Sequence, residues 1–359
     1  MNKPDILERI KKAGSIKSYT VKDSPFFNRG NNDFVTTEVP ALNIALSGKI
    51  NGGLSSGLTF LAGPSRHFKS LMGLILVKSY LKAKKDSICL FYDSEYGITP
   101  EYLASVGIDT ERMIHIPVEH IEQLKFDFVK RLDEISEKDN VIVFIDSIGN
   151  LASKKEVEDA LNEKSVADMT RAKAMKGLFR IVTPPLTCKD IPCIVVNHTY
   201  QEQALYPKTI MSGGTGPMYS ANTVFIIGRQ QEKEGTEITG YNFIINVEKS
   251  RYVREKAKIP ISVTFDGGLS RWSGLLDIAM ESGHVVKPSN GWYSRVIEGV
   301  QEEKKHRMKD TDTKEFWLDV LKDVTFQQWV NNHYQVSSGE LMGGETFIDK
   351  DLVEINDEV

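Results

Sequence analysis

The sequence contains no long hydrophobic run. No stretch of about 18 consecutive apolar residues occurs in the 359-residue chain, so an ordinary transmembrane helix is not expected. The first thirty residues alternate charged and polar side chains and lack the apolar segment of a secretory signal. We therefore expect a cytoplasmic protein without a membrane partner.

Cysteine is scarce. The chain has three cysteines, Cys89, Cys188 and Cys193, an odd number without the spacing of metal ligands. They lie in or beside apolar, strand-like segments, and a reduced structural role is typical of such cysteines in an intracellular protein. A disulfide framework is not expected.

An excess of positive charge is also missing. The chain has 45 Lys and Arg against 49 Asp and Glu, a formal net charge of −4. This argues weakly against binding to nucleic acid, because affinity for phosphates comes largely from cations that release counterions. Acidic residues gather at the C-terminus, where Lys350 is the one cation among Glu345, Asp349, Asp351, Glu354, Asp357 and Glu358. This tail is either a solvated terminus or a competitor that screens a basic groove.

A regular alternation of strands and helices is present instead. Apolar runs rich in Val, Ile, Leu and Phe occur at residues 58–63, 88–93, 141–146, 194–197 and 224–228. Such continuous runs are typical of parallel strands covered on both faces. Helix-compatible stretches separate them at residues 69–83, 121–135 and 157–181. The pattern predicts a doubly wound α/β core with a central, mostly parallel sheet, extended by a hairpin at 243–248 and 261–265.

Three regions are expected along the chain. Residues 1–32 contain a short helix at 2–12 and a linker, too small to hold a core of their own, and should contact a neighbouring copy. Residues 33–268 form the core. After Asp266-Gly267-Gly268 the pattern changes to helix and loop, and residues 269–359 are expected to form a small C-terminal α/β domain with the acidic tail.

A phosphate-binding loop is predicted where the first apolar run ends and a helix begins. It comprises Gly63, Pro64, Ser65, Arg66, His67, Phe68, Lys69 and Ser70. Loop N–H groups and the helix dipole can surround the phosphates of ATP, Lys69 can reach the β and γ phosphates, and Ser70 can hold Mg²⁺. Phe68 stands where the general motif has glycine. A left-handed conformation there costs roughly 1–2 kcal/mol, so either the loop differs or neighbours offset the strain.

Two carboxylates at later strand ends match this loop. Asp146 ends the apolar run Val141–Asp146, where it can hold Mg²⁺ opposite the loop; a helix N-cap is the alternative. Glu95 follows the run that ends at Asp93, and it can deprotonate the water that attacks the γ phosphate. Lysine, glutamate and aspartate at three successive strand ends indicate an ATP site.

These segments resemble the RecA family of strand-exchange recombinases, and within it the branch of T4-like phages. The resemblance rests on Gly63–Ser70, Leu90–Pro100, Val143–Lys155, Gly213–Ser220 and Gly291–Tyr293, and it covers roughly residues 30 to 320. It implies a RecA-like P-loop ATPase core with a short N-terminal oligomerisation segment. Phe68 becomes a mark of this phage branch.

The resemblance implies roles for individual residues. Glu95 is similar to the family's catalytic glutamate, and Tyr102 stands where a tyrosine stacks on adenine; a core-filling helix residue is the alternative. His198, after Asn197 at a strand end, stands where relatives sense the γ phosphate with a polar residue, which is glutamine in RecA. A buried, merely hydrogen-bonded histidine is the other interpretation.

Lys249 and Arg251 occupy the places of two basic residues that, in the family, reach the ATP of the adjacent subunit. Their alternating spacing puts both on one face of a strand. The resemblance then implies that ATP lies between protomers and that these cations stabilise charge in the transition state. A solvated basic edge strand is the alternative.

Two segments, residues 153–168 and 199–219, correspond to the DNA-binding loops of the family. The second can hold phosphates through main-chain N–H groups and hydroxyls without reading bases. The residues expected to contact DNA are Lys154, Lys155, Arg171, Lys176, Ser212, Gly213, Gly214 and Thr215. For the lysines and the arginine, a solvated helix face is the alternative.

The expected function is ATP-dependent recombination. The chain should form a filament on single-stranded DNA, pair it with homologous double-stranded DNA and exchange strands, with ATP and Mg²⁺ as cofactors. Expected partners are further copies of the chain, a recombination mediator and a single-strand-binding protein, in the host cytoplasm if a phage encodes the chain. The alternatives are a ring helicase, which usually has a sizeable extra N-terminal domain where about 30 residues precede this core, and a non-enzymatic ATP-binding mediator.

Overall fold

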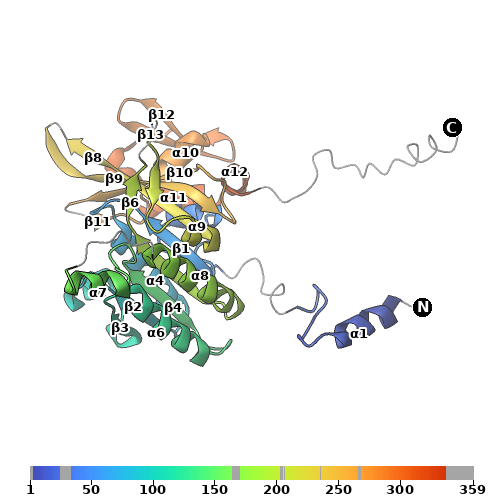
Figure 1. Ribbon diagram of the computed structural model, residues 1–359. Helices are drawn as coiled ribbons and strands as arrows, with labels where there is room; N and C mark the ends of the chain where they lie inside the picture. The colour runs from blue at the N-terminus through green and yellow to red at the C-terminus, as the bar shows by residue number, and fades with distance from the viewer. Residues whose placement is uncertain are drawn as a thin grey trace, which may run out of the picture.

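A large sheet organises the molecule. The structure, a computed structural model, describes residues 3–24, 34–163, 170–202, 205, 207–234, 236–265 and 268–336. In these ranges nine strands form one sheet in the order β11-β10-β9-β8-β1-β5-β4-β2-β3 (Figure 1). Strands β8 to β3 of this order run parallel, whereas β9, β10 and β11 are antiparallel additions. The predicted mostly parallel α/β core is confirmed.

The strands begin and end close to the predicted runs. Their bounds are β1 Gly57–Ala62, β2 Ile88–Asp93, β3 Met113–Pro117, β4 Val141–Asp146, β5 Pro192–Asn197, β8 Thr223–Glu234, β9 Glu237–Ser250, β10 Lys258–Thr264 and β11 Gly268–Leu269. The strand β3 was not predicted. It lies at the edge of the sheet with most of its side chains exposed, so its sequence lacks the continuous apolar run of a buried strand.

Helices cover both faces of the sheet, and two buried clusters fill the space beneath them. One cluster joins strand residues such as Leu61 and Phe144 to α3 Pro40–Ser47 and α4 Lys69–Ala83. The other joins the alternate strand residues to α6 Ile121–Glu134 and α8 Thr170–Cys188. Successive strand residues therefore point into different cores, as the pleat requires.

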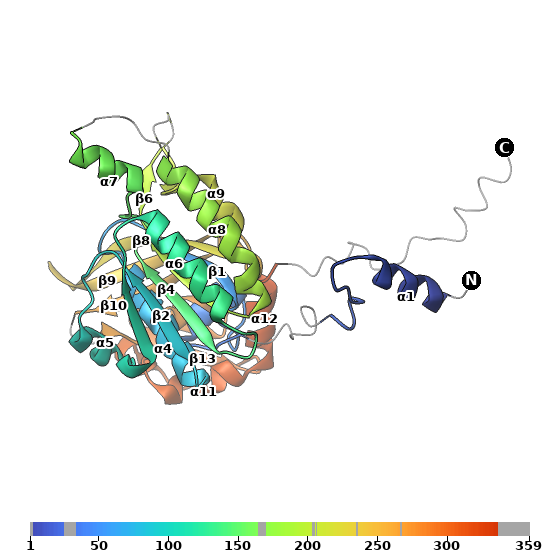
Figure 2. The ribbon, with the colours of Figure 1, turned by 60° about the horizontal axis from the view of Figure 1, so that its bottom comes forward.

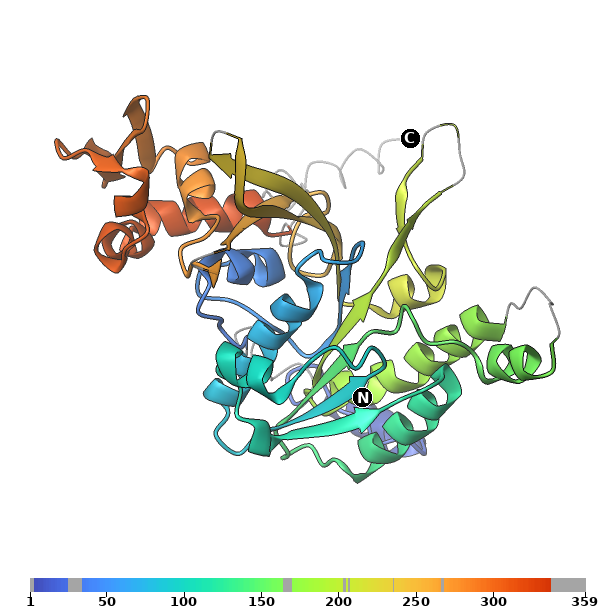
Figure 3. The same ribbon diagram turned by 90° about the vertical axis from the view of Figure 1, so that its left-hand side faces the viewer.

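The predicted helix at residues 157–181 was wrong in its bounds. The structure has α7 Lys154–Leu161 and α8 Thr170–Cys188, and residues 164–169 lie outside the described ranges. A capping box between Ser153 and Glu156 starts α7 earlier than the apolar pattern indicated. The expected DNA loop at 199–219 also contains regular structure, namely β6 Thr199–Gln201, β7 Thr209–Met211 and α9 Thr215–Ser220. The β6–β7 hairpin stands away from the body of the core (Figure 3).

The C-terminal region contains a small sheet beside helices, which agrees with the expected α/β composition; the positions of its strands were not predicted. Strands β12 Val285–Ser289, β13 Trp292–Ile297, β14 Val300–Gln301 and β15 His306–Arg307 form it. They are short and rich in polar and turn residues, so no alternating apolar pattern marks them. The helices α10 Leu275–Glu281, α11 Lys314–Lys322 and α12 Val324–Tyr334 pack beside them around the buried Trp317.

The remaining elements are short. They are α1 Lys3–Ala13, α5 Pro100–Val106 and the 3₁₀ turns Thr110–Arg112 and Met308–Thr311. Cys89 and Cys193 are free thiols, buried in β2 and β5. No helix in the described ranges has the length and apolar content needed to cross a bilayer.

Candidate nucleotide site and nucleic-acid interface

The predicted catalytic side chains meet at the carboxyl edge of the parallel strands. Strands β1, β5, β4 and β2 are successive neighbours, and their ends are in register: Ala62 lies opposite Asn197, and Asp93 opposite Asp146. Because the loops after parallel strands emerge at one edge, the segments that carry Lys69, His198, Asp146 and Glu95 converge there.

Lys69 begins α4 and is buried. Its Nζ donates a hydrogen bond to the carbonyl of Pro64 in the same loop (2.7 Å). Burial lowers the pKa of Lys69, while the nearby carboxylates Asp146 and Glu95 act in the opposite direction. The lysine is therefore held inside the loop, next to the carboxylates with which it is expected to work.

Phe68 adopts the left-handed conformation, with φ = 63°, directly before α4. The strain, roughly 1–2 kcal/mol for a non-glycine residue, is offset by packing, since the ring is 9% exposed and stacks on Phe243 of β9 at a centroid distance of 5.1 Å. Burying a phenylalanine contributes about 1.5–3 kcal/mol. Two explanations were considered for Phe68, a loop of different conformation or neighbours that offset the strain. The structure supports the second, because Phe68 adopts the left-handed conformation and its ring packs on Phe243.

Asp146 and Ser70, the two residues expected to hold Mg²⁺, lie side by side. Burial raises the pKa of Asp146 to about 6, the Ser70 side chain hydrogen-bonds to its carboxylate and opposes this rise, and Glu95 and Asp93 add to it. Its Oδ1 is buried and has no hydrogen-bond partner among the described residues. An orphaned carboxylate oxygen beside a serine hydroxyl fits Mg²⁺, which takes one or two protein ligands together with phosphates and water. Within the described residues there is no cluster of three or more His, Cys, Asp or Glu side chains that would hold a metal alone.

Glu95 is held by a network of donors. Ser147 Oγ donates to its Oε1 (2.6 Å), Asn150 Nδ2 donates to the same oxygen (2.9 Å), and His198 Nε2 lies 3.3 Å from it. The turn that carries Glu95 is fixed by Asp93, whose Oδ1 accepts from the Glu95 main-chain N–H (3.0 Å). Since the contacts found in the described ranges share Oε1, the second oxygen is available to accept a proton from water.

His198 connects this edge to the second expected DNA segment. Its ring lies against Gly149, where an added Cβ would come within 2.3 Å of the imidazole. Its main-chain carbonyl accepts from the Ser212 N–H (2.9 Å), and Asn197 Nδ2 donates to the Ser212 carbonyl (2.8 Å). The histidine side chain is 28% exposed and lies 3.3 Å from Glu95, while its main chain bonds the segment that begins at Ser212.

Tyr102 lies on α5. With Leu71, Ile75 and Leu269, among other residues, it lines an open cavity of about 390 Å³. The side chain is 39% exposed, and burial, followed by the charge of Asp146, raises its pKa. A half-exposed ring over apolar side chains fits a flat heterocycle, as expected for adenine.

Lys249 and Arg251 do not join this group in the same chain. Lys249 lies in β9, six residues after Phe243, which corresponds to roughly 20 Å along an extended strand. Its Nζ donates to the carbonyls of Met218 (2.8 Å) and Tyr219 (3.1 Å) at the end of α9, and burial lowers its pKa. Arg251 follows the strand and is exposed. Strand β9 lies inside the sheet, but its pairing with β10 ends at Asn246, so at Lys249 it pairs with β8 alone.

Arg171, predicted to contact DNA, is half-buried and bonded to main-chain carbonyls. Its guanidinium donates to the carbonyls of Leu151 (2.7 Å), Gly149 (2.8 Å) and Ile148 (3.1 Å), and burial lowers its pKa. Its Nη1 also lies 3.4 Å from Ser212 Oγ. These contacts tie α8 to residues 148–151, directly before the first expected DNA segment, and to Ser212 in the second, so Arg171 has a structural task.

The other residues predicted to contact DNA are mostly exposed. Gly214 and Thr215 are exposed, with Ser212 and Gly213 partly covered, and Lys154, Lys155 and Lys176 are exposed on α7 and α8. Lys154 Nζ lies 3.5 Å from Glu158. Gly213 and Gly214 have φ of 96° and 73°, and a Cβ on Gly213 would meet Met175 at 2.0 Å. Figure 2 shows α7, β6 and the start of α8 at one end of the molecule.

Comparison with known proteins agrees with this geometry. The RecA N-terminal domain model matches residues 27–270, and the model of the C-terminal domain of the bacteriophage T4 recombination and repair protein matches residues 272–330. The chain belongs to the RecA family. It is 54% identical over 351 residues to the recombination and repair protein of Enterobacteria phage T4, covering 95% of this chain and 89% of that protein. It is 25% identical over 265 residues to Protein RecA of Bacteroides thetaiotaomicron, covering 73% and 77% of the two chains.

The site of this RecA-family chain includes residues that sequence reasoning missed. Ser147 and Asn150 hold Glu95, and Asp93 shapes its turn. All three lie in the segments that carry the family resemblance, at or shortly after the end of a strand. That position was the sequence signal by which they could have been found. Arg229 and Phe243, which contact the phosphate loop, had no local signal, because the loop lies more than a hundred residues before them.

Proposed function

We propose that the chain is a DNA-dependent ATPase that assembles as a filament on single-stranded DNA and exchanges strands with a homologous duplex. One observation carries the proposal beyond family membership. Lys69, Ser70, Asp146 and Glu95 converge at one edge of the sheet, whereas Lys249, of the same RecA-type set, lies roughly 20 Å along β9 from the loop's contact with that strand. A complete site therefore needs a second copy.

Within one copy, each side chain has a separate task. The loop N–H groups and Lys69 bind the β and γ phosphates of ATP. Glu95, oriented by Ser147 and Asn150, accepts a proton from the attacking water. Mg²⁺, held by Ser70 and Asp146, would neutralise phosphate charge. Tyr102 stacks on adenine.

The neighbouring copy supplies the remaining charge. Lys249 and Arg251 approach the γ phosphate of the adjacent copy and stabilise the transition state, as an arginine finger does. To do so, Lys249 leaves the carbonyls of Met218 and Tyr219. ATP binding and filament contact then favour each other.

DNA enters this scheme through the segment that begins at Ser212. His198 lies 3.3 Å from Glu95, and its carbonyl bonds the Ser212 N–H. The N–H groups and hydroxyls of residues 212–215 bind phosphate oxygens, with Lys154, Lys155, Lys176 and Arg171 as the neighbouring cations. The ATP state favours the DNA-bound filament, and hydrolysis releases DNA by a shift in population.

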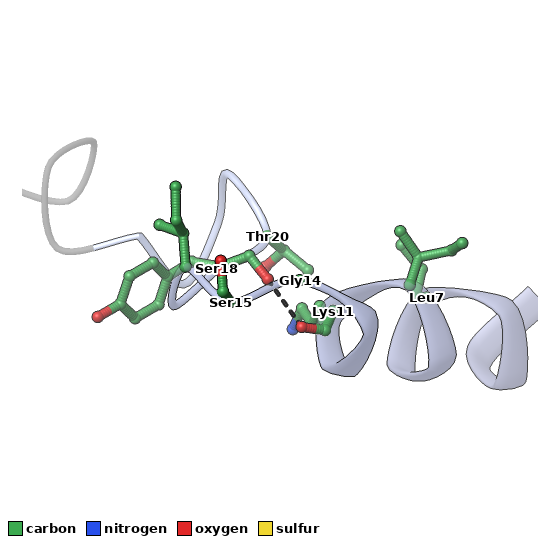
Figure 4. A pocket seen from close by; sticks show the side chains of 9 residues that line it. Leu7, Lys11, Gly14, Ser15, Ser18 and Thr20 are labelled. Carbon is green, nitrogen blue, oxygen red and sulfur yellow. Dashed lines mark hydrogen bonds between the residues drawn. The ribbon is translucent and has the colours of Figure 1, made fainter.

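Self-assembly involves the N-terminal segment. Residues Ile6, Leu7 and Ile10 of α1 are 42%, 55% and 64% exposed, an apolar stripe with helical spacing that a lone helix leaves in water. After Gly14 the chain folds back, and Ser18 Oγ donates to the Lys11 carbonyl (3.2 Å; Figure 4). We propose that residues 1–32 dock on the next copy, and that 33–268 and 269–359 are the core and C-terminal domain.

The partners and location follow from this activity. Single-stranded DNA and a homologous duplex are the substrates, and further copies complete the filament. A recombination mediator and a single-strand-binding protein are proposed as helpers, in the cytoplasm of the host cell.

The test is ATP turnover with and without single-stranded DNA, followed by a joint-molecule assay with a homologous duplex. We expect turnover to rise on addition of DNA. The Lys69→Ala variant should lose both turnover and joint molecules while its circular dichroism stays unchanged, because the loop loses its phosphate contact and not its packing. Full strand exchange by Lys69→Ala would contradict the role of the lysine.

Electron microscopy separates the alternatives. Filaments grow with the length of the single-stranded DNA, whereas a ring helicase forms particles of constant size. A wild-type chain that turns over no ATP under any of these conditions would be a binding protein and not an enzyme.

A further inference from the structure

The phosphate loop is attached to strand β9 through an aromatic contact. Phe68 and Phe243 stack with a centroid distance of 5.1 Å and an interplanar angle of 20°, and both side chains are buried. Phe68 directly precedes Lys69, and its buried ring, packed against Phe243, has little room to turn elsewhere. A displacement of the loop must therefore move the ring against Phe243.

Two further contacts attach the same loop to the β8–β9 pair. Arg229 Nη1 donates to the carbonyl of Arg66 (3.2 Å), and its guanidinium lies 4.6 Å from the ring centre of Tyr241 in β9. The main chain of Gly63 lies so close to β8 that an added Cβ would be 2.9 Å from the carbonyl oxygen of Ile227. The loop thus touches this strand pair at its beginning, middle and end.

Strand β9 connects these contacts to Lys249. Between Tyr241 and Val247 the strand pairs with β8 on one side, and between Gly240 and Asn246 with β10 on the other, which makes it a stiff element. Its pairing with β8 then shifts by one residue between Val247 and Lys249. Such a bulge changes the direction of the next side chain, so the position of Lys249 depends on the strand that Phe68 contacts.

We propose that β9 couples the phosphate loop of one copy to the two cations that this copy contributes to the next, with Phe68 as the positioning residue that transmits the state of the loop. The inference rests on the proposed function, in which Lys249 and Arg251 act across a subunit boundary. Because protein interiors are close-packed, a shift of the loop on binding a triphosphate reaches β9 through the stacked rings. ATP at one site then favours hydrolysis at the next, and turnover depends cooperatively on ATP concentration.

A merely structural Phe68 would have a different signature. If the ring only filled the core, its removal would lower the free energy of unfolding, as removal of any buried aromatic does, and would leave the shape of the ATP curve unchanged. The Hill coefficient of ATP turnover therefore separates the two roles.

The experiment measures initial ATPase rates against ATP concentration on saturating single-stranded DNA. The variants are Phe68→Gly, which restores the residue of the general motif, Phe243→Leu, and the two combined. Phe326→Leu is the matched control, since Phe326 is an equally buried aromatic of α12 in the C-terminal region. Arg229→Ala changes an exposed contact of the loop, and Arg307→Ala is its control, because Arg307 also lies over an aromatic ring, that of Trp292, at 3.8 Å.

We expect the wild type to be cooperative, and Phe68→Gly and Phe243→Leu each to lower the Hill coefficient to about 1, with no further loss in the combined variant. Arg229→Ala should lower it partly, and both controls should keep the wild-type value. Turnover in all variants should stay above that of Lys69→Ala, because the catalytic side chains remain.

Several outcomes would overturn the inference. They are a hyperbolic wild-type curve, unchanged cooperativity in Phe68→Gly, or an equal loss in Phe326→Leu. If Phe243→Leu does not fold, the Hill coefficients of Phe68→Gly and Arg229→Ala test the inference in its place. A wild type without DNA-dependent turnover would refute the proposed function, whereas a wild type with turnover but without cooperativity refutes this coupling alone.

Discussion

The two halves of the proposed nucleotide site hold their charges in different ways. At the carboxyl edge of the parallel strands, Lys69 and Asp146 are buried, and each changes the pKa of the other. At the end of β9, Lys249 is partly exposed and bonded to carbonyls at the end of α9, and Arg251 is exposed. The first half is pre-organised within one copy. The second half can move, as a group that must reach another copy requires.

The largest expected effect tests whether the second half acts between copies. Lys249→Ala alone should lower turnover by about 10³-fold or more, by analogy with the loss of an arginine finger. Mixing it with Lys69→Ala in equal amounts should restore up to about one quarter of the wild-type rate, because a head-to-tail filament pairs an intact loop with intact cations at that fraction of its contacts.

The control for this mixture is the double variant Lys69→Ala/Lys249→Ala. This variant can occupy the same filament positions, but it contributes neither an intact Lys69 nor an intact Lys249. Mixing it with Lys249→Ala should therefore restore no ATP turnover. Equal turnover in the two mixtures would mean that the two halves do not meet across a boundary.

A smaller effect comes from the buried charge of the first half. Burial raises the pKa of Asp146 from 3.8 to about 6, so between these values the folded chain binds more protons than the unfolded chain. Stability without nucleotide should fall as the pH rises from about 4 through about 6, by up to about 3 kcal/mol at neutral pH. Turnover should show the opposite trend and fall as the pH drops through about 6, because Mg²⁺ needs the carboxylate.

The Asp146→Asn variant tests the cost of this buried charge directly. It should unfold at a higher urea concentration than the wild type at pH 7.5, and its stability should depend less on pH. It should also lose ATP turnover. Asp86→Asn is the matched control, since Asp86 is exposed and should change neither stability nor turnover. An Asp146→Asn chain that is less stable than the wild type at pH 7.5 would contradict the expected cost of the buried charge.

The smallest expected effect concerns Tyr102, the half-exposed residue of the first half that is expected to stack on adenine. Tyr102→Ala should raise the KM for ATP about tenfold, the loss of one ring–base stack, with little change in kcat. Tyr102→Phe keeps the ring and should keep the wild-type KM. Tyr96→Ala removes a tyrosine from the segment before α5, which is 59% exposed and outside the cavity. A rise in KM equal to that of Tyr102→Ala would contradict stacking of Tyr102 on adenine.

Much of the first half could be predicted from the sequence because its signals are local. The helix 69–83 has the predicted bounds, and the strand ends at Asp93 and Asp146 match the apolar runs. In a parallel sheet the strand ends share one edge, so Lys69, Glu95 and Asp146 could be grouped before any contact was known.

Other features had no local signal. The polar strands β12 to β15 lack an apolar period, so their positions within the expected C-terminal α/β domain could not be predicted. Arg171 looked like an exposed helix cation, and only the approach of the carbonyls of Ile148, Gly149 and Leu151 gives it a structural task. The role of each predicted DNA contact remains a prediction.

The sequence by itself determined the chemistry of the phosphate loop, the order of the buried core strands and the family, because propensity, apolar period and motif are properties of short segments. Only the tertiary structure decided what offsets the strain at Phe68 and how far Lys249 lies from the loop of its own chain. The reason is physical: the stacking of Phe68 on Phe243, like the distance along β9, depends on how segments far apart in the chain pack.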